Sequence, residues 1–287
     1  MTRDLSELRH DIDAIDDKIH ELLQQRTKIV EEVRAYKKNQ DIKIRPAREA
    51  EIIYRLFNQH QGAFPKSELF RIWRELIVAT LRFEGPFSVA VFTNENDTGL
   101  WDLARDQYGS FSPMMPMPST RRIIEAVQKQ DATLGILPMP IRKEDKPWWR
   151  RLVFESPETP RIIARLPFVP GSNARTHESE ALVICPVPQE ATGRDRSYLA
   201  LETNEKISSS SLAIAFEQVG LPIVFTSDCL DPSRPKVWQT LVEVDGFATA
   251  EDPRVKAIED TFDGAITRVV DLGGYATQIT ETEMENN

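Results

Sequence analysis

The chain has 287 residues, of which 40% are hydrophobic and 28% charged, and this length and composition are typical of a folded protein with two or three domains. No run approaches the roughly 20 apolar residues of a membrane span and the N-terminus lacks a signal peptide's apolar core, so we expect a cytoplasmic protein with no membrane partner. The net charge of −9 is concentrated beyond residue 86, where 20 Lys or Arg face 30 Asp or Glu, and this excess argues against nucleic-acid binding.

The first part of the chain predicts three helices. Apolar residues recur every three or four positions from Leu5 to Tyr36, which indicates one long helix. Pro46 interrupts this pattern, and further helices are expected over residues 48–60 and 67–84. Two short helices cannot bury the apolar seam of the long one. We therefore expect residues 1–86 to be an all-α domain that dimerises through the long helices.

The sequence pattern of the remainder is typical of an α/β protein. Between residues 87 and 195, short runs rich in β-branched residues alternate with helical stretches, which indicates an α/β domain. Residues 196–280 predict the order βαββαβ of a ferredoxin-like domain. The acidic tail over 281–287 is expected to be frayed. The two cysteines and four histidines show no metal-ligand spacing, so we expect no metal and no other cofactor.

Arg26 occupies a seam position of the long helix where Leu or Ile would be expected. A cation there either reaches solvent or a structural carboxylate, or it lines a site for an anion. Lys37 lies about three turns further on and projects from nearly the same face. Arg9 does not share that face, and it would reach the same pocket most easily from a partner chain.

The two shorter helices add further polar groups. Arg48 and Glu49 are adjacent on the second helix, whereas Thr80 and Glu84 share one face of the third because they are four residues apart. Such pairs are often solvated surface, but apolar residues surround Thr80 and Glu84. Together the cations, hydroxyl and carboxyl groups suit a small dicarboxylate that bears a hydroxyl. They include no nucleophile and base pair, so a reaction that needs only positioning and electrostatics would fit.

The helical part resembles the all-helical (type II) chorismate mutase family. The resemblance lies in LxxLRxxIDxID at 5–16, LLxxR at 22–26, Lys37, IRPAREAEI at 44–52 and RELIVATLRFE at 74–84. It implies a pericyclic rearrangement of chorismate to prephenate, an isomerase reaction of aromatic amino-acid biosynthesis, in a homodimer. The site would hold a compact conformer and stabilise negative charge on the ether oxygen.

The resemblance also implies a role for each of these polar groups. Arg26 and the partner's Arg9 would hold the two carboxylates, and Thr80 would touch one of them. Lys37 would hydrogen-bond the ether oxygen and a carboxylate. Glu49 would accept the ring hydroxyl, and Arg48 would orient the site. Glu84 would face the ether oxygen and can donate a hydrogen bond only when protonated, so we expect activity to increase as pH falls.

The second part resembles two further domains more loosely. Residues 88–140 resemble the start of a prephenate dehydratase domain, and residues 197–276 resemble an ACT regulatory domain. The dehydratase motifs are replaced at 92–99, 137–141 and 196–198, so we expect this domain to be catalytically silent.

The motifs of the ACT-like part that bind an aromatic amino-acid effector are replaced by SSSL at 209–212 and SDCL at 227–230, so a structural or oligomerisation role is favoured over an effector site. Two alternatives remain open. One is a bifunctional chorismate mutase/prephenate dehydratase. The other is a non-catalytic regulatory protein whose helices only dimerise.

Overall fold

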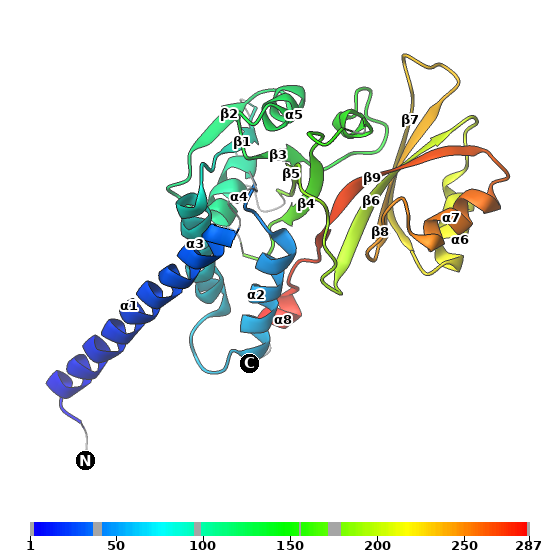
Figure 1. The fold of residues 1–287 in the computed structure, drawn as a ribbon. Coiled ribbons are helices and arrows are strands. Elements are labelled where there is room, and N and C mark those ends of the chain that lie inside the picture. The colour runs from blue at the N-terminus through cyan, green and yellow to red at the C-terminus, as the bar shows by residue number, and fades with distance from the viewer. Residues whose placement is uncertain (1–2, 37–41, 95–98, 155, 172–178, 286–287) are drawn as a thin grey trace. The chain divides into compact units, whose positions relative to one another are not determined.

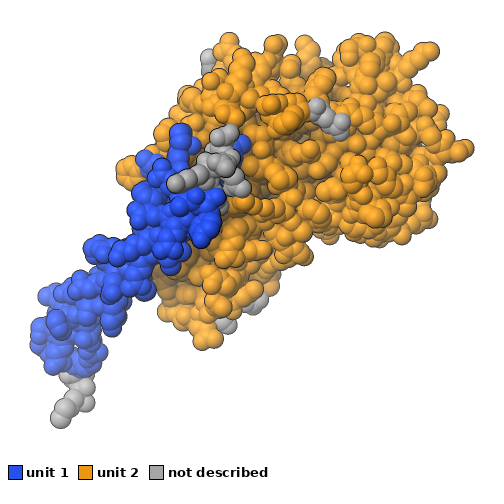
Figure 2. Space-filling view, in the orientation of Figure 1, with its two compact units in different colours: residues 1–44, 79–86 blue, residues 45–78, 87–287 orange. Residues whose placement is uncertain are grey.

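A computed structural model of the chain describes residues 3–36, 42–94, 99–154, 156–171 and 179–285. Its contacts divide the chain into two units, coloured separately in Figure 2. We call residues 1–44 and 79–86 the N-terminal unit, and residues 45–78 and 87–287 the main unit. No described helix combines the length and the apolar character needed to cross a membrane.

The N-terminal unit consists of helix α1 (Leu5–Tyr36) and the last turns of helix α3 (Lys66–Glu84) (Figure 1). The predicted long helix is thus confirmed, and none of its 32 residues is buried. Its apolar seam is exposed by 39–93% at Leu5, Leu8, Ile12, Ile15, Ile19, Leu22, Ile29, Val33 and Tyr36. A stripe of this length on a helix surface needs a covering partner.

The other predicted helices of the first part are also confirmed. Helix α2 (Pro46–Gln59) begins with a proline, which is favoured at a helix start because its missing amide hydrogen has no intrahelical partner there. In the main unit, α2 and the first half of α3 share an apolar core with segments that lie far away in sequence. This core contains Ala50, Ile53, Tyr54, Phe57, Phe70, Phe168, Val169 and Ile279.

A nine-stranded sheet, in the order β2-β1-β3-β5-β4-β9-β6-β8-β7, forms the centre of the main unit (Figure 1). Strand β1 pairs in parallel with β2 and β3, whereas β3 pairs antiparallel with β5 and β5 antiparallel with β4. Its first strands are β1 (Val89–Phe92), β2 (Met114–Met117), β3 (Leu134–Pro138), β4 (Arg161–Leu166) and β5 (Ala181–Cys185). Helices α4 (Gly99–Tyr108) and α5 (Thr120–Gln128) follow β1 and β2, so this half is an α/β mixed sheet.

The second half of the sheet has the predicted βαββαβ order. Its elements are β6 (Asp195–Thr203), α6 (Ser209–Gln218), β7 (Ile223–Leu230), β8 (Trp238–Asp245), α7 (Pro253–Thr261) and β9 (Ile266–Ala276). All strand pairs within this half are antiparallel. Both helices pack on one face, where Leu212 and Phe216 of α6 and Val255 of α7 join Leu199 and Val242 of the strands in one core.

The two halves of the sheet meet at a single parallel pairing between Ile162 of β4 and Gly273 of β9. Gly273 has a φ of 90°, which disfavours any residue with a side chain. A Cβ atom at this position would also collide with the backbone carbonyl of Ile162. Glycine is therefore required for β4 and β9 to lie against each other.

Local features complete the main unit. Residues 114–117 form edge strand β2, and residues 148–152 form the short 3-10 helix η1 (Trp148–Leu152). The prediction of a frayed tail is wrong for helix α8 (Glu281–Glu285), because Arg194 binds the Glu283 carboxylate at 2.6 Å and Lys66 binds the Glu283 carbonyl oxygen at 2.7 Å.

Candidate functional site

Arg26 lies against the end of α3 within the N-terminal unit. Its Nη1 donates a 2.7 Å hydrogen bond to Oγ1 of Thr80. The arginine is half-buried, and this burial lowers its pKa from the ordinary value. The guanidinium nevertheless stays protonated at neutral pH, since arginine titrates only in strong base. The structure therefore brings together the Arg26 cation and the Thr80 hydroxyl, which the sequence analysis predicted for one site.

Glu84 lies one turn beyond Thr80 on the same helix. The exposed fraction of Glu84 is only 7%, although it is the last residue of α3. Because residues four apart share a helix face, the carboxyl group lies on the same side of α3 as the Thr80 hydroxyl. The N-terminal unit thus places one cation, one hydroxyl and one buried carboxyl group within a short stretch of surface.

Glu49 forms a second polar cluster, within the main unit. Its Oε2 accepts a 2.7 Å hydrogen bond from Nη1 of Arg74, and the exposed fractions of the two side chains are 11% and 3%. Arg74 Nε also donates to the carbonyl oxygen of Gln107 at 2.8 Å. The guanidinium carbon lies 5.8 Å from the centre of the Tyr108 ring. Arg74 of α3 thus connects Glu49 of α2 to Gln107 near the end of α4.

Sequence reasoning missed Arg74, although a signal was present. Phe70, Ile77 and Leu81 form the buried stripe of α3, and Arg74 stands at the position where a fourth apolar residue would be expected. Arg26 was singled out on the same pattern in α1. The pattern identifies a buried cation, but it does not identify the partner, which comes from another helix.

Of the remaining predicted residues, Arg48 and Arg9 are not part of either cluster. Arg48 is exposed on α2 and pairs at 3.0 Å with Glu51, one turn away. Arg9 is exposed on α1, within the same chain segment as the uncovered apolar seam. Lys37 lies outside the described residues, so its predicted place beside Arg26 stays a prediction.

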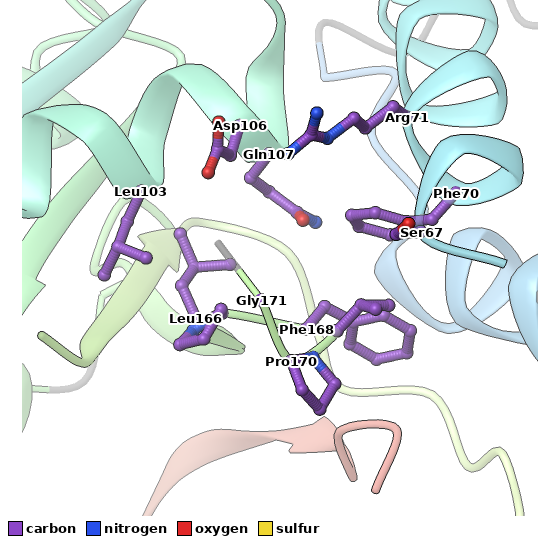
Figure 3. Close-up of a pocket in the computed structure, with 12 residues that line it drawn as sticks. Ser67, Phe70, Arg71, Leu103, Asp106, Gln107, Leu166, Phe168, Pro170 and Gly171 are labelled. Atoms are coloured by element: carbon purple, nitrogen blue, oxygen red, sulfur yellow. The ribbon is translucent and has the colours of Figure 1, made fainter. Parts of the chain in front are cut away.

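A small pocket in the main unit lies between α3, α4 and residues 166–171 (Figure 3). Phe70, Leu103 and Phe168 contribute its apolar walls, and Arg71 and Asp106 are polar groups at its edge. Its volume is about 30 Å³. This is room for about two water molecules, so a dicarboxylate cannot enter it in this conformation.

The chemistry available in these clusters is positioning and charge stabilisation. Arginine can bind a carboxylate with two parallel hydrogen bonds, and a buried carboxylate can accept a hydrogen bond from a substrate hydroxyl. Groups of three or more potential metal-ligand side chains do not occur among the described residues. A unimolecular rearrangement of an anion needs no more than the groups found here.

Comparison with known proteins assigns the helical segment. Residues 8–85 match the family described as Chorismate mutase type II. This segment is a chorismate mutase type II domain. It includes both polar clusters on α1, α2 and α3, and all seven residues that the sequence placed in the site.

Two curated relatives are similar to about half of this chain. A bifunctional chorismate mutase/prephenate dehydratase from Aquifex aeolicus is 30% identical over 141 residues, which are 47% of this chain and 39% of that protein. A second, from Pseudomonas aeruginosa, is 26% identical over 141 residues, 47% of this chain and 38% of that protein. The chain thus matches well under half the length of these relatives.

Solved structures show weaker similarity. A prephenate dehydratase from Streptococcus mutans is 13% identical, with a TM-score of 0.46 over 67% of this chain and 98% of that chain. A protein described as GqqA, a novel type of quorum quenching acylase, is 12% identical, with a TM-score of 0.49 over 69% of this chain and 98% of that chain.

Proposed function

We propose that the chain is a chorismate mutase that rearranges chorismate to prephenate without a covalent intermediate. The match of residues 8–85 to the chorismate mutase type II family carries this proposal. The Arg26 and Thr80 contact supports it, because it keeps a guanidinium at the position where a substrate carboxylate would bind. In the free protein, the Thr80 hydroxyl accepts a hydrogen bond from Nη1 of Arg26. A substrate carboxylate would use the same donor.

The active form is a homodimer in this proposal. The uncovered apolar seam of α1 supports a second copy of the chain as the covering partner. The partner's Arg9 and Arg26 would bind the two carboxylates, and Lys37 would bind the ether oxygen. Glu49 would accept the ring hydroxyl while Arg74 holds it in place, and Thr80, Arg48 and Glu84 would complete the site.

The second part has no catalytic role in this proposal. Residues 87–195 would be a reduced prephenate dehydratase-like domain, and residues 196–280 an ACT-like domain with a structural role. The βαββαβ order supports the latter assignment. Ser208 caps α6 by accepting the Ser211 amide at 3.0 Å, and Ser227 donates to the Ile141 carbonyl at 3.0 Å, so these serine-containing segments already have structural contacts.

The experiment is chorismate turnover by the purified full chain, with product analysis by chromatography. Arg26→Ala is expected to lower kcat/KM by about 10²- to 10³-fold, as for the loss of one transition-state donor. Lys28→Ala, an exposed change on the same helix, is the control and should stay within about twofold of the parent. Phenylpyruvate formation would favour the bifunctional alternative, and absence of chorismate loss would overturn the proposal.

A further inference from the structure

The main unit contains a cleft of about 660 Å³ that the mutase site does not use. The start of α5 and the segment around η1 form one wall, and residues of β6, β8 and β9 with the turn after β7 form the other. This volume is in the range of about 300 to 1,000 Å³ that is typical of small-molecule sites. The cleft is therefore large enough for an organic ligand.

Positive charge is concentrated in this cleft. Six cations line it, namely Arg121, Lys146, Arg150, Arg151, Arg234 and Arg268, against two carboxylates, Glu202 and Asp231. The lining has a formal charge of +4, six minus two, although residues 87–287 carry 20 Lys or Arg against 30 Asp or Glu. This local reversal of sign would raise the local concentration of small anions.

Both carboxylates are built into the cleft wall. Arg150 donates to Asp231 at 2.9 Å and to the amide oxygen of Gln239 at 2.7 Å, and Arg234 binds both Glu202 and Asp231. Burial alone would raise the pKa of Asp231, but hydrogen bonds from Ser233 and Arg234 hold it at about 2. The hydrogen bond from Arg234 likewise lowers the pKa of Glu202. The two acids thus stay ionised and fix the cations that surround them.

An apolar wall adjoins the cations. Trp148 and Val153 are buried beneath the cleft, but Phe154 is 72% exposed. A large apolar side chain this exposed beside a charged cavity provides a surface on which a planar ring can pack. The cleft therefore combines groups that recognise negative charge with one that recognises a ring.

We propose that this cleft is a second ligand site, which binds a small organic dianion with a ring, such as a cyclic dicarboxylate. The exposed cations Lys146 and Arg151 bind the anionic groups, together with Arg121, which also pairs with Glu125 at 2.6 Å, and the ring packs on Phe154. A nucleic acid is disfavoured because it would extend beyond the cleft onto the acidic remainder of this part of the chain. The inference does not depend on the proposed mutase activity.

Isothermal titration of the full-length protein with isophthalate, a ring with two carboxylates, tests this site. The cleft variant carries Arg121→Gln, Lys146→Gln and Arg151→Gln, which are all exposed positions. A matched control carries Arg105→Gln, Arg122→Gln and Lys129→Gln, which are also exposed, lose the same charge and lie outside the cleft. The variant Arg26→Ala shows whether isophthalate binds at the mutase site and not in the cleft.

Isophthalate is expected to bind the parent, the control and Arg26→Ala alike, and to bind the cleft variant at least about tenfold more weakly. Higher salt should weaken the same binding, because exposed charges are screened. Absence of binding to the parent, or loss of binding in Arg26→Ala but not in the cleft variant, would overturn the proposal. Equal binding of L-phenylalanine, whose net charge is zero, would overturn the dianion specificity.

Discussion

Arg74 and Glu49 form an ion pair that is almost fully removed from solvent. Removing one member leaves a buried charge without its partner, which costs about 3 to 5 kcal/mol. We therefore expect Arg74→Met to lower the free energy of unfolding by that amount in denaturant titrations. The double variant Arg74→Met with Glu49→Leu should lose less, because no charge is stranded. A single variant as stable as the double one would contradict this account of the pair.

Glu283 attaches the C-terminal helix α8 through charge. The hydrogen bond from Arg194 lowers the pKa of Glu283 from its ordinary 4.5 to about 2. A carboxylate with a lowered pKa stabilises the fold above its unfolded pKa, and this stabilisation is lost as pH falls from about 4.5 to about 2.

Glu283→Gln should therefore reduce stability at pH 7 by roughly 1 kcal/mol or less, since the pair is partly exposed. The difference from the parent should vanish near pH 2 in thermal unfolding. Glu281→Gln, an exposed change on the same helix, is the control. A stability difference that is constant with pH would show that charge does not hold α8.

At the scale of elements, α1 presents an apolar seam that nothing in the single chain buries. Charged residues in a coiled-coil seam oppose association, because each must be desolvated. Ile15→Glu with Leu22→Glu should convert a dimer to a monomer in light scattering after size exclusion, and abolish turnover that needs the partner's Arg9. The control His10→Glu with Gln24→Glu places the same charges on the opposite face. Equal masses for the two variants would contradict the proposed dimer.

The junction of the two sheet halves depends on Gly273. Gly273→Ala should lower the free energy of unfolding by roughly 2 kcal/mol or more, because it adds a backbone collision to the cost of a positive φ. Gly264→Ala is a matched control, since its φ is also positive, at 81°, but a Cβ there meets no atom within 4 Å. Equal losses of stability in urea titration would show that the contact with Ile162 is unimportant.

Periodicity was sufficient to predict most helices and strands, because each has a clear apolar pattern of its own. It could not predict β2, whose sequence MMPM has neither alternation nor β-branched residues, and which forms by pairing with β1. The pairing of β4 with β9 joins residues more than one hundred positions apart. Such pairings depend on tertiary packing, which local sequence does not encode.

The same limit applies to the candidate site. Arg26 and Thr80 were each predicted from a position on a helix, and in the structure the two side chains share a hydrogen bond. The partner of Glu49 was not predicted, because Arg74 approaches from a different helix and is itself held by a carbonyl group of α4. Sequence patterns therefore identified chemistry-bearing residues more readily than the residues that position them.

In the whole molecule, a helical chorismate mutase type II domain is followed by a larger α/β part with its own cationic cleft. The helical domain and the α/β part are not independent in the main unit, because α2 and α3 share a core with Phe168, Val169 and Ile279. The proposed activity is nevertheless one reaction, chorismate to prephenate.

Prephenate formation from chorismate by the purified full chain is the measurement that decides this activity. We expect the parent to form prephenate, and Arg26→Ala to form it with a kcat/KM lowered by about 10²- to 10³-fold, because a donor to a substrate carboxylate is lost. No prephenate at any pH would contradict the assignment of a chorismate mutase.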